Sequence, residues 1–408
     1  MDSSAEVPQY FTCPISLQIM KDPVTTSTGI TYDRESIERW LSVDVANPTC
    51  PLTKQPLPRD SHLTPNHTLR RLIQAWCDSD WIPMLPVAVD SRPSIDQLIR
   101  RLSAPHLQLD ALRQLSALAR GSDSVRRLLA QSGVPKAMMS VITSCSNKIM
   151  LIDRIEAALR ILHSLKLSPD DLKPIVSGSD HCIINAMTWV LLHGASEETN
   201  YRELKSTTTL IFKTVIEAAN PGVLEQLKTE FFAAMLSVIR DRISQQATKA
   251  ALQILLHACL LGRNRIKIVE AGGVKEIVEL ELVMVPDKRT TELNLGVLSQ
   301  LCLSADGRAE LVGHAAGIAA VAKRILRVSP AADDEGVKIF YSLCRYSATN
   351  EVLQEMMSVG AVLKLCLVLQ ANCSRSVKEK AIWVLRLHSR AWKDCHPCVQ
   401  AYLLTRCS

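Results

Sequence analysis

The apolar residues of the larger, C-terminal part of the chain recur at helical spacing. Stretches rich in Ala and Leu alternate with polar positions over lengths typical of amphipathic helices. Three of these stretches look alike, at residues 157–165, 250–256 and 381–387. Small and unbranched apolar residues of this kind suit a helix that is buried between other helices. The pattern predicts a mainly α-helical protein.

Glycines fall at regular intervals in this helical part. They are Gly133, Gly178, Gly222, Gly273, Gly317 and Gly360. The intervals between them are 45, 44, 51, 44 and 43 residues. A period of this length is typical of armadillo or HEAT repeats, which stack into an α-solenoid. An irregular helical bundle with glycines at chance positions is the alternative interpretation.

The first 80 residues follow a different pattern, with many turn residues and short strand signals. Residues 22–26 and 30–32 flank a Ser-Thr-Gly turn and predict a β-hairpin. A helix is expected over 34–41, and a second helix from about Asn66. This part therefore predicts a small α+β domain.

Prolines separate the two patterns. Pro83, Pro86 and Pro93 stand too close together for a helix to continue through them. The predicted organisation is a compact domain over 6–80, a proline-rich linker over 81–93, an armadillo-type solenoid over 94–395 and a C-terminal tail over 396–408.

Composition agrees with this division and limits the classes of protein. A chain of 408 residues is too long for one hydrophobic core, and 47% hydrophobic residues with only 4% aromatics suit a helical array. The net charge of +6 is uneven, because residues 1–80 carry 7 Lys and Arg against 10 Asp and Glu. The basic excess therefore lies in the solenoid. It hints at acidic partners or membrane surfaces, although most such charges are simply solvated.

The sequence also indicates where the protein is found. A secretory signal begins with basic residues followed by an apolar run, and the start of this sequence lacks that pattern. No apolar stretch reaches the roughly 18 residues of a membrane span. The 13 cysteines are scattered singly, so we expect reduced thiols rather than disulfides. We expect a cytoplasmic protein, with the nucleus and the membrane surface as further locations.

Two short motifs in the N-terminal domain resemble the start of a zinc-binding pair. They are Cys13-Pro14-Ile15-Ser16 and Cys50-Pro51-Leu52-Thr53, and each has a hydroxyl where a second thiolate is needed. A fold with two structural zinc ions needs eight Cys or His ligands. Residues 8–77 contain only three Cys and two His. We therefore expect no metal and no cofactor.

At these motifs the sequence resembles the U-box family, which adopts the RING backbone with hydrogen bonds and salt bridges in place of zinc. The matching segments cover nearly the whole domain: residues 10–16, 20–24, 29–34, 50–53 and 63–66, with Ile37, Trp40 and Leu41 between them. The resemblance implies a ubiquitin ligase. Small polar residues are candidates for the internal network that replaces metal, namely Ser16, Asp22, Thr53 and Asn66.

The resemblance also implies a surface for a ubiquitin-conjugating enzyme charged with ubiquitin. Its expected apolar anchors are Ile15, Trp40 and Pro51, and Lys54 stands where family members hold the thioester in its reactive arrangement. Such a ligase supplies proximity and no nucleophile. A catalytic thiol at Cys13 is disfavoured, since no His is near it in sequence.

The solenoid resembles the armadillo repeats that follow the U-box in plant ligases. In that family it selects the protein substrate, and several members restrain immune and stress signalling. The asparagine ladder of nuclear-import armadillo proteins is absent, because the aligned positions are Ile161, Ile254, Gln300, Ser342 and Val384.

Alternatives remain open for the whole chain. One is a non-catalytic armadillo scaffold or adaptor. A nucleic-acid-binding solenoid is disfavoured because aromatic residues that stack on bases are not interleaved with the basic ones. Self-association is also left open.

Overall fold

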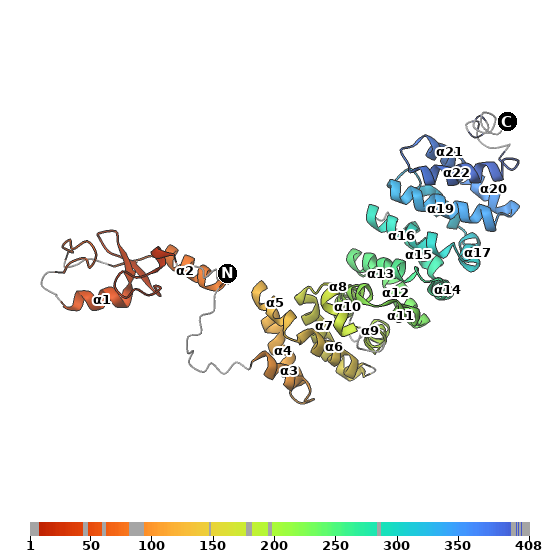
Figure 1. The fold of residues 1–408 in the computed structure, drawn as a ribbon. Coiled ribbons are helices and arrows are strands. Elements are labelled where there is room, and N and C mark those ends of the chain that lie inside the picture. The colour runs from red at the N-terminus through yellow and green to blue at the C-terminus, as the bar shows by residue number, and fades with distance from the viewer. Residues whose placement is uncertain are drawn as a thin grey trace. The chain divides into compact units, whose positions relative to one another are not determined.

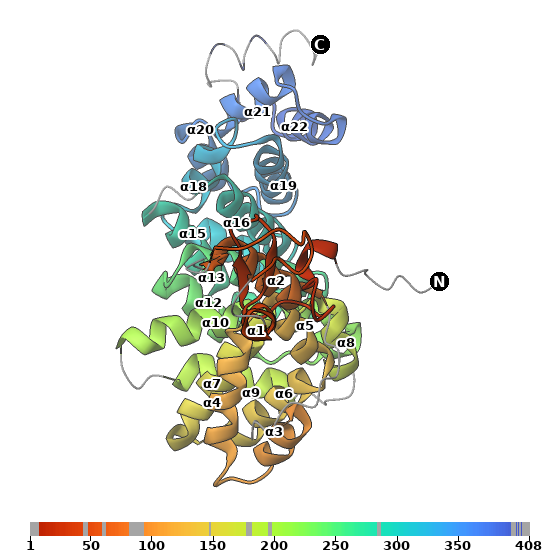
Figure 2. The same cartoon turned by 90° about the vertical axis from the view of Figure 1, so that its left-hand side faces the viewer.

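A computed structural model divides the chain into two units, residues 1–91 and 92–408. Figures 1 and 2 show both units in two views. The structure describes residues 8–43, 48–58, 63–80, 94–146, 148–176, 182–194, 198–283, 287–392, 397, 399 and 401. The expected linker therefore lies outside the described residues, as does most of the expected tail.

The first unit is a small α+β domain. Its elements are η1 (Gln9–Phe11), β1 (Pro23–Thr25), β2 (Thr31–Asp33), α1 (Arg34–Val43), β3 (Thr64–Pro65) and α2 (His67–Asp80). The sheet has the order β2-β1-β3, and both pairs are antiparallel. Val24 in β1 is the central residue, since it pairs with Tyr32 on one side and Pro65 on the other. The predicted hairpin and both predicted helices are confirmed.

This domain has its own hydrophobic core. Val24, Tyr32 and Ile37 are fully buried in it, and so are the side chains of Cys13 and Cys50. The two cysteines thus connect the loops that carry the expected surface residues to the core of the domain.

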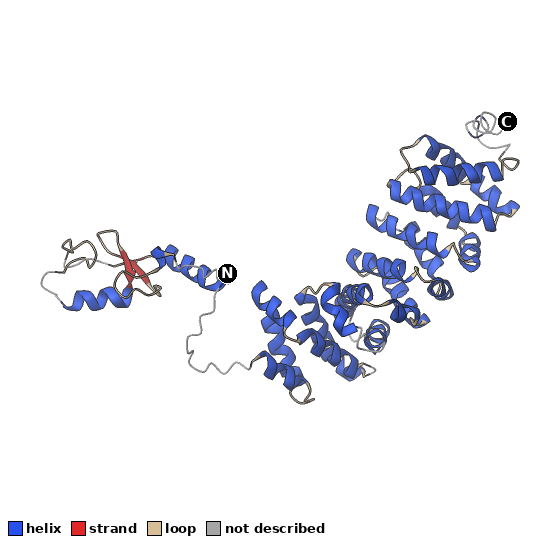
Figure 3. Ribbon diagram, viewed as in Figure 1, coloured by secondary structure: helices blue, strands red, loops and turns tan. Residues whose placement is uncertain are grey.

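The second unit consists of stacked helices (Figure 3). The helices are α3 (Ile95–Leu102), α4 (Gln108–Ala119), α5 (Asp123–Gln131), α6 (Val134–Cys145), α7 (Ile152–Leu165), α8 (Pro169–Val176), α9 (Cys182–His193), α10 (Glu198–Ala218), α11 (Pro221–Glu225), α12 (Thr229–Asp241), α13 (Gln245–Ala258), α14 (Gly262–Glu270), α15 (Gly273–Val283), α16 (Lys288–Leu301), α17 (Ala305–Gly313), α18 (Gly317–Arg324), α19 (Pro330–Tyr346), α20 (Asn350–Ser358), α21 (Ala361–Gln370) and α22 (Arg375–Leu387), with the short η2 (Ile149–Leu151) before α7.

From α5 onward these helices form groups of three. The last helix of each group packs on the last helix of the next, which gives a row of α4, α7, α10, α13, α16, α19 and α22. We call it the third-helix row. A second row runs through α6, α9, α12, α15, α18 and α21. Each group buries its apolar face only against its neighbours, as expected of an armadillo-type solenoid.

The periodic glycines mark the start of the middle helix of several groups. Gly133 and Gly360 precede α6 and α21 with φ of 75° and 72°, a backbone conformation that glycine adopts without steric cost. Gly273 and Gly317 begin α15 and α18. In these four repeats the sequence period thus has a structural cause, because a glycine lies where the middle helix begins. Gly222 instead lies within α11, and Gly178 lies outside the described residues.

Among the described residues, no single helix has both the length and the apolar character needed to cross a membrane. The helices α20 and α21 reach that limit only as a pair, and the pair is bent by 65°.

Candidate functional site

Two loops of the first unit share one backbone turn. Residues 13–18 and 50–55 both read Cys-Pro, an apolar residue, a hydroxyl residue, one further residue and Gln. In each loop the cysteine N–H donates to the glutamine carbonyl at 2.8 Å. The residue before the glutamine, Leu17 or Lys54, has a left-handed backbone with φ of 57° or 58°. The two loops therefore have the same backbone conformation. They differ in the side chains that this backbone carries.

Hydroxyl groups surround the sulfur of the second loop. The Tyr32 hydroxyl lies 3.0 Å from Cys50 Sγ, and Thr28 Oγ1 donates to the same atom at 3.3 Å. Burial disfavours the thiolate, but these hydroxyls and Thr53 outweigh burial and lower the pKa of Cys50 to about 6. The Tyr32 hydroxyl also accepts from Leu52 N–H at 3.2 Å. One buried tyrosine thus holds the loop at two points.

Backbone donors surround the sulfur of the first loop. The N–H of Asp33 donates to Cys13 Sγ at 3.3 Å. Burial opposes ionisation here too, but the N–H groups of Asp33, Ser16 and Ile15 and the Ser16 hydroxyl lower the pKa of Cys13. Both sulfurs thus accept hydrogen bonds at the positions where a zinc-binding relative needs metal ligands.

Asp22 joins three elements of the domain. Its carboxylate accepts from Arg34 Nε on α1 at 2.6 Å and from Arg70 Nη1 on α2 at 3.3 Å. The hydrogen bond from Arg34 lowers the pKa of Asp22, and the charge of Arg70 adds to it. The Asp33 carboxylate accepts from the N–H groups of Lys21 and Asp22 at 2.7 and 2.9 Å. The segment before β1 is therefore tied to both helices.

The four residues predicted for this network have separate roles. Asp22 makes the ion pairs just described, and Ser16 and Thr53 bond the cysteine sulfurs. Asn66 lies at the start of α2, where its Oδ1 accepts from Leu69 N–H at 3.0 Å and its N–H donates to Pro23 O at 2.8 Å. The four do not form one cluster.

Sequence reasoning missed the partners of this network. They are Thr28, Tyr32, Asp33, Arg34 and Arg70. All but Thr28 and Arg70 lie in the motif that carries the U-box resemblance, so the signal was present for Tyr32, Asp33 and Arg34. Nothing in the sequence pattern indicates Arg70, because it meets Asp22 only after α2 has packed on the sheet.

Trp40 and the second loop form one surface. The Trp40 side chain is on α1 and is 40% exposed, and its indole N–H donates to Thr49 O at 3.0 Å. The Lys54 ammonium lies 5.2 Å from the centre of its ring. Pro51 in the same loop is half-buried. The structure therefore brings Trp40 and Lys54 together.

The first loop adds further apolar side chains. Ile15 is half-buried and packs against the core of the domain. Leu17 is 78% exposed, and Leu52 in the second loop is 60% exposed. Neither leucine was predicted as a surface residue. They occupy different positions of the repeated loop, because Leu52 aligns with Ile15 and Leu17 aligns with Lys54.

Comparison with known proteins follows the same division into two units. The U-box domain family matches residues 7–81, and the family described as plant U-box protein ARM repeat region matches residues 94–408. The chain belongs to the plant U-box ubiquitin ligases. Members of this group are transferases of the RING type, which form no covalent intermediate with ubiquitin, and this plant U-box ligase has the same two-part fold.

Its relatives match over almost their whole length. E3 ubiquitin-protein ligase PUB23 from Arabidopsis thaliana is 42% identical, over 98% of this chain and 96% of its own. E3 ubiquitin-protein ligase PUB22 from the same plant is 38% identical, over 98% of both chains. E3 ubiquitin-protein ligase PUB24 is 36% identical, over 99% of this chain and 97% of its own.

The positions aligned with an asparagine ladder are mostly internal in this ligase. Ile161, Ile254, Ser342 and Val384 are buried between helices. Gln300 is half-buried, and its Oε1 accepts from Arg265. These side chains therefore offer no surface row of amides for a peptide backbone.

Proposed function

We propose that the U-box of this ligase recruits a ubiquitin-conjugating enzyme on the surface formed by Ile15, Trp40 and Pro51. The observation that carries the proposal is the exposed indole of Trp40, held in place by its hydrogen bond to Thr49 O. A fixed aromatic side chain loses little entropy on binding, and a few central anchors supply most of the energy of a small interface.

Lys54 is proposed to assist the transfer itself. Its ammonium already lies over the Trp40 ring, so a bound partner meets both groups together. A substrate lysine amine attacks the thioester carbonyl, the new C–N bond forms, and the C–S bond to the conjugating enzyme breaks. Lys54 donates hydrogen bonds that hold ubiquitin in the orientation for this attack. A guanidinium fork suits that bridging role better than an ammonium.

The solenoid is proposed to hold the protein substrate, which the U-box then marks for degradation. The third-helix row provides a long surface with polar side chains from successive repeats. By similarity to its family, we propose a role in immune or stress signalling and a location in the cytoplasm, with the nucleus and the membrane surface as further locations.

A reconstituted reaction tests the proposal against the scaffold alternative. Full-length protein is incubated with activating enzyme, conjugating enzyme, ubiquitin and ATP. Ubiquitin chains on the ligase itself support the proposal, and their absence with several conjugating enzymes supports a scaffold. Lys54→Ala should slow discharge of ubiquitin to free lysine, whereas Lys54→Arg should preserve or increase it. Equal rates for all three proteins contradict the role of Lys54.

A further inference from the structure

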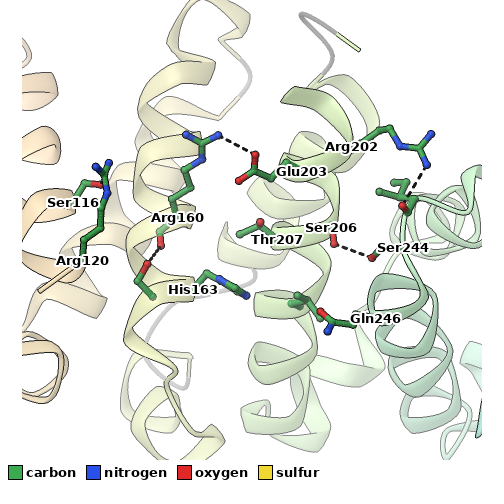
Figure 4. A pocket seen from close by; sticks show the side chains of 13 residues that line it. Ser116, Arg120, Arg160, His163, Arg202, Glu203, Ser206, Thr207, Ser244 and Gln246 are labelled. Carbon is green, nitrogen blue, oxygen red and sulfur yellow. Dashed lines mark hydrogen bonds and ion pairs between the residues drawn. The ribbon is translucent and has the colours of Figure 1, made fainter. Parts of the chain in front are cut away.

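The third-helix row contains a cleft rich in arginine and hydroxyl side chains (Figure 4). It has a volume of about 750 Å³ and is lined by α4, α7, α10, α13 and residues next to them. Three arginines belong to it: Arg120, Arg160 and Arg202. They stand 40 and 42 residues apart, close to the repeat period, so successive repeats each supply one guanidinium.

The positive charge of this cleft is only partly neutralised. Among the described residues that line it, Glu203 is the one acidic residue. Its carboxylate lies 3.3 Å from Arg160, which also pairs with Glu156 at 2.7 Å. Arg120 donates to Ser116 Oγ at 3.2 Å. Arg202 donates to a backbone carbonyl, that of residue 243, at 3.3 Å. Within the part of the chain that the structure describes, neither Arg120 nor Arg202 forms an ion pair.

Hydroxyl groups lie between the arginines. Ser206 Oγ and Ser244 Oγ are 3.1 Å apart and join α10 to the start of α13. Ser164 also lines the cleft, and its hydroxyl donates to Arg160 O at 2.8 Å. A hydroxyl carries one donor, so one member of the Ser206–Ser244 pair keeps its donor for a ligand. The guanidinium groups are therefore the main donors to anionic oxygen atoms, and they bind carboxylate and phosphate in a planar, two-bond geometry.

The spacing of the arginines indicates an elongated ligand. Packed helices lie about 8–10 Å apart, so Arg120 and Arg202 are separated by roughly 20 Å across α7. An extended chain rises about 3.3 Å per residue, so about six residues cover this span. The lining residues that the structure describes include no Phe, Tyr or Trp for base stacking, which favours a peptide over a nucleic acid.

We infer that this cleft binds an extended acidic segment of the substrate, whose carboxylate or phosphoryl groups contact Arg120 and Arg202. The inference rests on the proposed function, in which the solenoid holds the substrate. It adds the chemical class of the segment that is recognised and the residues that recognise it. An acidic segment supplies negatively charged partners for Arg120 and Arg202, which have none among the described residues. It leaves the ion pair between Arg160 and Glu203 in place.

Fluorescence anisotropy with the full chain tests this inference. The probes are labelled peptides of about twelve residues, long enough to exceed the cleft: one with central glutamates, one with glutamines in their place, and one with phosphoserines. The glutamate or phosphoserine peptide should bind, and the glutamine peptide should not. Tighter binding of the phosphoserine peptide assigns recognition to phosphoryl groups, and equal or tighter binding of the glutamate peptide assigns it to carboxylates.

Two double variants make the test specific. Arg120→Gln with Arg202→Gln should weaken binding at least about tenfold, because each removes charge-assisted hydrogen bonds. Arg263→Gln with Arg327→Gln removes the same charge from exposed positions outside the cleft and should bind like wild type. Equal loss in both double variants, equal binding of the glutamine peptide, or tighter binding of a single-stranded oligonucleotide overturns the inference.

Ubiquitin discharge to free lysine, measured on the same preparations, separates this inference from the proposed function. Wild type and both double variants should discharge equally, since the substitutions lie outside the U-box. If wild type discharges nothing, the proposed function fails by itself, while the peptide measurements still decide what the cleft binds.

Discussion

Tyr32→Phe removes one hydroxyl from the centre of the hydrogen-bond network that supports the second loop. The side chain is fully buried, so the phenyl ring keeps its packing and only two interactions are lost. Cys50 Sγ loses its contact at 3.0 Å, and Leu52 N–H loses its acceptor at 3.2 Å. The substitution therefore tests whether hydrogen bonds to sulfur stabilise a domain of this fold.

The size of the stability loss depends on whether Cys50 Sγ and Leu52 N–H find another hydrogen-bond partner. A buried group left without its partner costs about 1–3 kcal/mol. Leu52 is exposed and its N–H can bond water, while Cys50 keeps its bonds from Thr28 and Thr53. The lower half of that range is therefore expected, about 1–2 kcal/mol, which corresponds to a fall in Tm of roughly 5–15 °C for a domain of this size.

The assay is scanning calorimetry of the full chain together with hydrogen exchange of the second loop. The U-box transition should move down while the solenoid transition stays, and exchange at Leu52 should accelerate. Tyr10→Phe is the matched control, because Tyr10 is 66% exposed in the same domain. An unchanged U-box Tm and unchanged exchange at Leu52 refute the reasoning.

The pH dependence of the U-box Tm gives a second test of the same hydrogen bonds. The pKa of Cys50 is lowered in the folded domain to about 6, so the thiolate contributes stability above the unfolded pKa of about 8.5. That contribution is lost as the pH falls through about 6. The U-box Tm should therefore rise with pH over this window in wild type, and less in Tyr32→Phe.

Three further predictions concern other parts of the molecule. Asp22→Asn should destabilise the U-box at neutral pH and flatten its loss of stability below about pH 4, because the lowered pKa of Asp22 ties its stabilising charge to the ionised state; equal acid melting curves for both proteins contradict this. Glu281→Ala should destabilise the solenoid by about 3–5 kcal/mol in chemical unfolding, because the buried Arg324 loses the carboxylate that lies 2.6 Å away. Glu379→Ala, which removes an exposed ion pair, should cost less than about 1 kcal/mol. A chelator should leave the U-box Tm unchanged, because the domain is expected to fold without zinc. Stoichiometric zinc in the purified protein, together with a large fall in Tm when the zinc is removed, contradicts this.

Local patterns in the sequence predicted the elements, because strands, helices and turns depend on neighbouring residues. The hairpin, both U-box helices and the repeat period all follow from such patterns. Pairing across repeats could not be predicted in the same way. Glu281 and Arg324 are 43 residues apart and meet only when two repeats stack. Arg120, Arg160 and Arg202 share this property. Arg120 follows the end of α4, Arg160 lies inside α7 and Arg202 lies near the start of α10, so only the stacking of the repeats brings them to one cleft.

The candidate surface of the U-box was predicted from resemblance rather than from physical pattern. Ile37, Trp40 and Leu41 stand at helical spacing in the sequence, and that spacing alone suggests three core residues. The structure separates them, with Ile37 fully buried and Trp40 half-exposed beside Lys54. Only the packing of the second loop against α1 decides which apolar residue of the helix faces outward.

The affinity of the full chain for a conjugating enzyme, compared between wild type and Trp40→Ala, tests the central proposal most directly. Loss of an aromatic anchor should cost about 2 kcal/mol or more, which corresponds to a rise in Kd of about 30-fold. Leu72→Ala, at an exposed apolar residue of α2, should leave the Kd unchanged. A Trp40→Ala protein that remains folded by circular dichroism and binds the conjugating enzyme as tightly as wild type contradicts the account.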